Sequence, residues 1–224
     1  MRTFDYDESR AQIEPVPPAT LGHSLFGLFS SGITEEEQIA VAVRPVGQMV
    51  AVGIPDEDFP HVGAVRLYLE GEWKQPVAEL VNHARLVVIL LGTGSGTVWE
   101  VIQAVCTLPP ERLILLIPDG LTSKEYEQIR TRVSRGLRRR ARANRNRTWP
   151  LGSRPSLPPC PLASVEVPEI GFIRFSADWE PQATRALYGI NTPTHNFLST
   201  LLSEITPLFI ELEKYEKRVG RTWG

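Results

Sequence analysis

Two nearly continuous apolar runs, 86–91 and 112–117, dominate the hydrophobic pattern of the chain. Runs of this length, with almost no polar residue between the apolar ones, are typical of strands buried on both faces in a parallel sheet. Further apolar segments predict additional strands at 23–30, 49–53 and 170–175, and a short strand or an irregular segment at 64–69. The strand content is therefore spread over most of the sequence.

Helix signals separate these strands. Thr34 and Glu37 fit a capping box, in which hydroxyl and carboxylate satisfy two free N–H groups reciprocally. Elsewhere apolar residues recur three and four positions apart, as on the buried side of a helix. Helices are predicted from Thr34 to just before Pro45, at 73–83, at 97–107, from a cap at Thr122 to about Leu137, and at 194–219 with an interruption or kink at Pro207.

The alternation of strands and helices predicts a doubly wound α/β fold with right-handed crossovers. We expect three layers, with helices on both faces of a mostly parallel sheet of about five strands. Residues 1–20 are polar and contain prolines, so they should form a loose arm before a single domain at 21–224. Residues 138–168 are rich in arginine and proline and should form an insertion on the surface.

The composition mainly argues against particular kinds of protein and site. Hydrophobic residues make up 42% and charged residues 22% of the 224, and the net charge is −2, which are ordinary values for a globular protein. Cys106 and Cys160 are too few for a disulfide framework, and the four scattered histidines suggest no metal site. We see no signal peptide and no apolar stretch long enough to span a bilayer, so we expect a soluble, cytoplasmic protein.

The run at 86–91 leads into a glycine-rich turn that is the main candidate for a functional site. Gly92, Gly94 and Gly96 precede a helix that should begin near Thr97, with Glu100 in its first turn. The spacing fits neither the Rossmann fingerprint nor a P-loop. Such a turn could bring backbone N–H groups close to a phosphate or a ribose, or it could simply need glycines with positive φ angles.

The segment Gly96-Thr97-Val98-Trp99-Glu100-Val101-Ile102-Gln103-Ala104 resembles the Gly-Thr-x-x-Glu-x-x-x-Ala element of nucleoside 2-deoxyribosyltransferases. In that family the glutamate attacks or stabilises the sugar carbon of an N-glycosidic bond. The wider stretch from Thr34 to about Gly120 resembles a bacterial group of TIR-like domains that are often attached to membrane segments. That second resemblance rests on residues 50–55, 63–68, Trp73, 84–88 and 96–100.

These resemblances imply a flavodoxin-like, TIR-like three-layer sandwich. They also imply a nucleotide-binding domain that cleaves an N-glycosidic bond, such as an NAD glycohydrolase or an N-ribosyl hydrolase or transferase. NAD or another nucleotide would be the substrate, no separate cofactor would be needed, and self-association could complete the site. The implied catalytic residue is Glu100, and the implied ligand-binding residues are Gly53, Ile54, Pro55, Arg66, Tyr68, Gly92, Thr93, Gly94, Ser95, Gly96, Thr97 and Trp99. The alternative is a non-catalytic TIR-like interaction module.

The position of Glu100 bears on its role. A carboxylate in the first turn of a helix is favoured in its ionised form by the helix dipole, which suits a nucleophile better than a general acid. An acidic residue also commonly occupies that turn without any catalytic role, because it stabilises the helix.

Nine arginines lie between Arg130 and Arg147. Such a cluster could neutralise phosphates of a nucleic acid, or it could be a solvated helix end and linker. No aromatic residues alternate with the arginines, and no nucleic-acid-binding motif is present. From the sequence we therefore do not expect a nucleic-acid partner.

Overall fold

The structure is a computed structural model that describes residues 35–53, 64–69, 71–118, 121–143, 155–161, 169–187 and 193–220. Several sequence predictions fall outside these residues, namely the arm at 1–20, the strand at 23–30, the cap at Thr34, and the ligand-binding positions Ile54 and Pro55.

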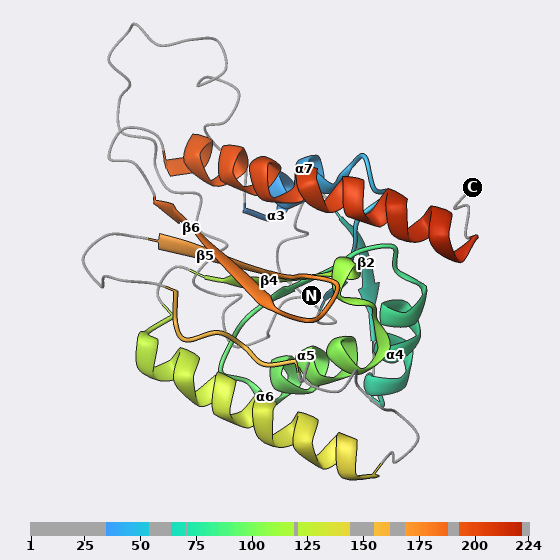
Figure 1. Ribbon diagram of the computed structural model, residues 1–224, viewed down its shortest axis with the longest axis vertical. Coiled ribbons are helices and arrows are strands. Elements are labelled where there is room, and N and C mark those ends of the chain that lie inside the picture. Colours follow the sequence, from blue (N-terminus) through green and yellow to red (C-terminus); the bar gives the residue numbers. More distant parts are fainter. Residues whose placement is uncertain are drawn as a thin grey trace, which may run out of the picture.

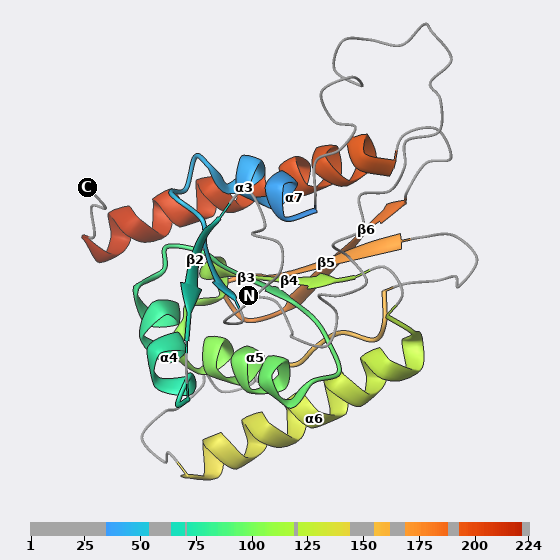
Figure 2. The same ribbon diagram turned by 180° about the vertical axis from the view of Figure 1, so that it is seen from behind.

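Helices and strands alternate as the sequence predicts (Figures 1 and 2). The helices are α3 (Glu35–Val43), α4 (Lys74–His83), α5 (Ser95–Thr107), the short 3-10 helix η2 (Pro110–Arg112), α6 (Ser123–Ala143) and α7 (Pro193–Val219). The strands are β1 (Val50–Gly53), β2 (Val65–Tyr68), β3 (Val87–Leu90), β4 (Leu113–Ile117), β5 (Glu169–Phe175) and β6 (Pro181–Leu187). Thr122 caps α6 as expected, since its hydroxyl accepts from the Glu125 N–H at 3.2 Å and the Glu125 carboxylate accepts from the Thr122 N–H at 2.9 Å.

The strand arrangement differs from the predicted sheet, which was mostly parallel with about five strands. Strands β1 and β2 form a parallel pair of their own, and the larger sheet has the order β3-β4-β5-β6. Within it, β3 and β4 are parallel, whereas β5 is antiparallel to β4 and β6 is antiparallel to β5. The fold is therefore mixed α/β, and β6 is a strand that the hydrophobic pattern did not indicate.

The chain between β4 and β5 explains why β5 is antiparallel. Helix α6 returns the chain toward the amino end of β4, as in a normal parallel crossover. Residues 155–158 then run back along α6 in the opposite direction. The Arg130 side chain donates from Nε to the Leu157 carbonyl at 3.0 Å, and the Tyr126 hydroxyl donates to the Pro158 carbonyl at 2.9 Å. The chain thus reaches β5 at the carboxyl end of β4, so β5 must run antiparallel to β4.

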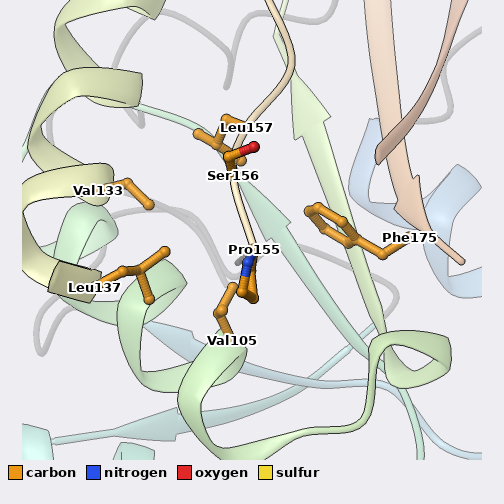
Figure 3. A pocket seen from close by; sticks show the side chains of 7 residues that line it. All are labelled: Val105, Val133, Leu137, Pro155, Ser156, Leu157 and Phe175. Carbon is orange, nitrogen blue, oxygen red and sulfur yellow. The ribbon is translucent and has the colours of Figure 1, made fainter. Parts of the chain in front are cut away.

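Of the predicted surface insertion at 138–168, the structure describes only residues 138–143 and 155–161, and these two parts differ from the prediction. The first part, up to Ala143, belongs to α6, which is longer than the sequence indicated. Pro155 is buried, and Leu157 is only 2% exposed. Figure 3 shows Pro155, Ser156 and Leu157 passing between α6 and Phe175 of β5, and the space between them is too small for a water molecule. Here Pro155 lines part of the core, whereas Pro159 of the same segment is exposed.

Helices cover both faces of the larger sheet (Figures 1 and 2). On one face, side chains of α4, α5 and α6 pack against Ile89, Leu115 and Ile173. On the other face, α3 and α7 pack against Ile114 and Leu116. The main core thus lies between the sheet and α4, α5 and α6, which places the β3–α5 turn at its margin.

Helix α7 runs continuously through Pro207, so the predicted interruption is wrong. Leu208 and Leu212 are 0% and 1% exposed, and this burial holds the helix together across the proline. Near the end of α7, Glu216 accepts from Arg85 Nε at 2.5 Å and from Arg85 Nη2 at 2.7 Å. This bidentate pair ties α7 to the segment that leads into β3.

A second arginine stabilises the end of α4. Arg112 is 5% exposed, and its guanidinium donates to the backbone carbonyls of Asn82, Ala84 and Arg85. The last carbonyls of a helix lack intrahelical partners, and a cation placed there satisfies them and interacts favourably with the helix dipole. Arg112 therefore fixes the junction between α4 and β3. The glycine-rich turn follows at the other end of β3.

Candidate functional site

The glycine-rich turn lies between the carboxyl end of β3 and the first turn of α5. Gly94 is the N-cap residue of α5, with φ −59° and ψ 151°, and no side chain caps the helix there. The first N–H groups of a helix have no intrahelical partner. Ser95 is exposed and Gly96 is half-buried, so a ligand could approach their N–H groups, whereas Thr97 is 0% exposed. On the opposite side of the turn, Arg132 of α6 donates from Nη1 to the Thr93 carbonyl at 2.5 Å.

The glycines of this turn are not explained by positive φ angles, which was one of the two roles that the sequence suggested. Gly94 has a negative φ, and Gly96 lies within the helix, where its φ is not in the left-handed region. The explanation by positive φ angles is therefore wrong for these two positions. A Cβ added at Gly96 would meet the Trp73 ring at 3.7 Å, which is ordinary van der Waals contact. Neither strain nor a close internal contact therefore requires a glycine at 96.

We expect Gly96→Ala to fold normally. Alanine is the better helix former, so the free energy of unfolding should be unchanged or higher by up to about 1 kcal/mol. The added methyl group would lie beside the exposed N–H groups of α5, and it should weaken any ligand that approaches them closely. Urea unfolding and ligand titration of the same preparation check the two effects. A clear loss of stability would show that Gly96 has a packing role.

Glu100 lies deeper than the sequence suggested. It is the sixth residue of α5, and the first turn contains no acidic residue. Because α5 begins at Ser95 rather than near Thr97, Glu100 falls in the second turn and on the same side of the helix as Thr97. This side also carries Val101 and Ala104, both 0% exposed, and it faces the core. Glu100 itself is only 5% exposed.

The carboxyl group of Glu100 is buried, and one of its oxygens has no hydrogen-bond partner among the described residues. Within the described part of the chain, neither Glu100 Oε2 nor Thr97 Oγ1 has a hydrogen-bond partner. Burial raises the pKa of Glu100 from 4.5 to about 7. The expected first-turn position is therefore wrong. Burial outweighs the helix dipole that was expected to favour the ionised carboxylate, and both protonation states are populated near neutral pH.

Two tryptophans flank this end of α5. Trp99 and Trp73 meet edge to face, with ring centroids 5.1 Å apart and an interplanar angle of 82°. Both are partly buried and pack against the main core, so Trp99 acts at least as a core aromatic. Because the Trp73 ring also lies next to Gly96, the pair forms an aromatic border beside the start of the helix.

The other predicted ligand-binding positions lie in the two-stranded sheet. Gly53 and Tyr68 are register partners at the carboxyl ends of β1 and β2, and Arg66 lies opposite Ala51. The Tyr68 side chain is 48% exposed, and the Arg66 side chain is partly buried. The structure thus gathers Gly92 to Glu100 around one turn, while Gly53, Arg66 and Tyr68 belong to a separate pair of strands.

Comparison with known proteins gives no family assignment. No protein-family model, no curated protein and no solved structure matches this chain. Among the helices that the structure describes, none is long and apolar enough to cross a membrane. In the same residues, no group of three or more histidine, cysteine, aspartate or glutamate side chains is placed to bind a metal. The functional argument therefore rests on the chemistry of the site.

Two features that bear on the site could not be recognised from the sequence. One is the Arg132 contact with the glycine-rich turn, because nothing in the pattern of arginines distinguishes this residue from its neighbours. The other is a second buried glutamate, Glu111 of η2, which is 6% exposed. Its Oε1 lies 3.5 Å from Nη2 of Arg218 on α7, so this carboxylate has a cationic neighbour.

Proposed function

We propose that the protein binds an NAD-type nucleotide at the β3–α5 turn and hydrolyses its N-glycosidic bond with the help of Glu100. One observation carries this proposal: a carboxyl group 5% exposed, with one oxygen unpartnered among the described residues, lies one turn below an uncapped helix N-terminus. A flavodoxin-like, TIR-like layout remains part of the proposal. It agrees with the alternating elements and with helices on both faces of the sheet.

The energetic argument is that an uncompensated buried carboxyl group lowers stability. Taking such a group out of water costs free energy unless hydrogen bonds or charges replace the water. Groups with strongly raised pKa values are concentrated at functional sites, because the same environment that destabilises their charge makes them reactive. Among the described residues Glu111 is a second buried glutamate whose Oε2 has no hydrogen-bond partner, but its Oε1 lies 3.5 Å from Nη2 of Arg218, so a cation compensates part of its charge.

The chemistry needs the ionised form of Glu100. As the bond between the ribose C1′ and the nicotinamide nitrogen breaks, its electron pair leaves with the nicotinamide and positive charge develops on the sugar. A carboxylate beside C1′ stabilises this oxocarbenium-like state. Water then forms the new C1′–O bond and releases a proton, which the carboxylate can accept. The cationic nicotinamide ring would itself favour the ionised form of Glu100 in the complex.

The direct test is to incubate the protein with NAD and to measure free nicotinamide by chromatography from pH 5.5 to 8.5. Because the free protein must lose the Glu100 proton, we expect kcat/KM to rise with pH and to reach half its plateau near pH 7. Absence of nicotinamide release would contradict hydrolysis. If NAD also failed to bind, a non-catalytic interaction module would be the better description.

A further inference from the structure

We propose that the outer side of α6 is a binding surface for the phosphate backbone of a nucleic acid. The surface consists of Arg135, Arg138, Arg139 and Arg142, which we call the arginine stripe. All four side chains are exposed. Their spacing of three and four residues places them on one side of the helix, over a length of about 10 Å. In both views no helix or strand lies outside α6 on this side (Figures 1 and 2).

The positive charge of the stripe is not neutralised by the described elements around it. From Arg132 to Ala143, helix α6 contains no acidic residue. The elements that pack against α6 are α5 and the segment 155–161, and their only acidic residue is the buried Glu100. Other arginines of α6 have local partners. Arg130 pairs with Glu127 at 2.9 Å, Arg132 bonds to the Thr93 carbonyl, and Arg140 donates to Gln103 Oε1 at 3.0 Å.

The arrangement is unfavourable for the isolated helix. Arg135 with Arg139, and Arg138 with Arg142, are like-charged pairs four residues apart, and each destabilises a helix by about 0.2–0.5 kcal/mol. The helix dipole offsets part of this repulsion for the residues in the last turn. An anionic ligand that contacts all four side chains would remove the repulsion, so the stripe fits a partner with closely and regularly spaced negative charges.

The residues favour a phosphodiester backbone over other anionic partners. Every basic residue between 132 and 142 is an arginine, whose planar guanidinium binds phosphate oxygens through two parallel hydrogen bonds. A helix that lies on a membrane needs exposed apolar residues, but Tyr126, Ile129, Val133 and Leu137 of α6 are all buried in the core. A length of about 10 Å corresponds to about three spacings of 3.4 Å along one strand, which join about four phosphates.

No side chain of the stripe is placed to read base edges, so we expect binding that is insensitive to sequence and sensitive to salt. With four phosphates neutralised, the affinity between 50 and 200 mM salt should fall about 150-fold for duplex DNA and about 50-fold for single-stranded RNA. The probes are fluorescently labelled mixed-sequence duplex DNA and single-stranded RNA, and the measurement is fluorescence anisotropy of the whole chain. Vesicles with 30% anionic phospholipid provide the competing surface.

A matched pair of double variants locates the site. Arg138→Gln/Arg142→Gln should reduce the loss of affinity for duplex DNA to about 12-fold over the same salt range, since two phosphate contacts are lost. Lys214→Gln/Lys217→Gln removes two exposed positive charges from α7 and should leave binding as in the wild type. Thermal unfolding shows that the arginine variant is folded, and its melting temperature should not fall, because like-charge repulsion is relieved.

Three results would overturn the proposal. The first is no binding of either nucleic acid at 50 mM salt, or binding to the vesicles alone. The second is an equal loss of affinity in the lysine variant, because it would show that total charge rather than the stripe matters. The third is an affinity that does not change with salt. None of these results depends on whether Glu100 is catalytic.

Discussion

Glu100→Gln is expected to reduce nicotinamide release from NAD by at least about 100-fold. Glutamine has nearly the same shape as glutamic acid but cannot accept a proton or carry the negative charge that stabilises the sugar cation. Loss of a positioned general acid or base typically costs a factor of about 10² to 10⁴. The change should appear mainly in kcat, because the interaction is made most strongly in the transition state. Steady-state kinetics with a nicotinamide assay measures it.

Glu111→Gln is the matched control for this experiment. Glu111 is also a buried glutamate, 6% exposed, but it precedes β4 at the amino end of the strand, away from the β3–α5 turn. The substitution should leave turnover within about twofold of the wild type. Equal turnover in the wild type and in Glu100→Gln would remove Glu100 from the mechanism. A similar loss in both variants would point to a general effect on the fold.

The same Glu100→Gln variant should be more stable than the wild type at alkaline pH. In the folded protein burial raises the pKa of Glu100 from 4.5 to about 7. Between these two values the unfolded chain releases the proton while the folded chain retains it, so the wild type loses stability as the pH rises. At about 1.4 kcal/mol per pH unit, the total loss above pH 7 is about 3 kcal/mol. Glutamine does not titrate, so the free energy of unfolding of the variant lacks this pH dependence.

The measurement is urea unfolding of both proteins at pH 4.5, 6 and 8. Their free energies of unfolding should be similar at pH 4.5, where Glu100 is protonated in the folded state, and should differ by about 3 kcal/mol at pH 8. The control is Glu79→Gln on the exposed side of α4, which should follow the pH profile of the wild type. A wild type that loses no stability relative to Glu100→Gln up to pH 8 would show that Glu100 is solvated. Together with the turnover assay, this result would show whether burial of the carboxyl group costs stability while supporting activity.

The hydrophobic pattern predicted most individual elements, because their signals are local. The apolar run at 112–117 is β4, whose five residues are all buried, and the glycine-rich turn does join β3 to α5. The start of α6 was predicted correctly because a side chain, that of Thr122, makes its cap. The start of α5 was misplaced because Gly94 caps without a side chain, and this error moved Glu100 from the second turn to the first.

The sheet could not be predicted in the same way, because it depends on contacts between distant parts of the chain. The antiparallel direction of β5 follows from where residues 155–158 lie along α6, and this is set by the Arg130 and Tyr126 bonds to backbone carbonyls. Proline-rich composition is common in surface loops, and nothing local indicates that Leu157 is 2% exposed. The raised pKa of Glu100 is likewise a property of its three-dimensional surroundings.

The position of α7 also has a consequence for synthesis of the chain. One face of β4 is covered by Leu208 and Leu212, which follow it by roughly 90 residues. At about 5–20 residues per second, a ribosome needs roughly 5–20 s to make that length of chain. During this interval the apolar side chains of Ile114 and Leu116 have no cover from α7. A nascent chain therefore passes through a period in which a chaperone that shields apolar surface would raise the yield of folded protein.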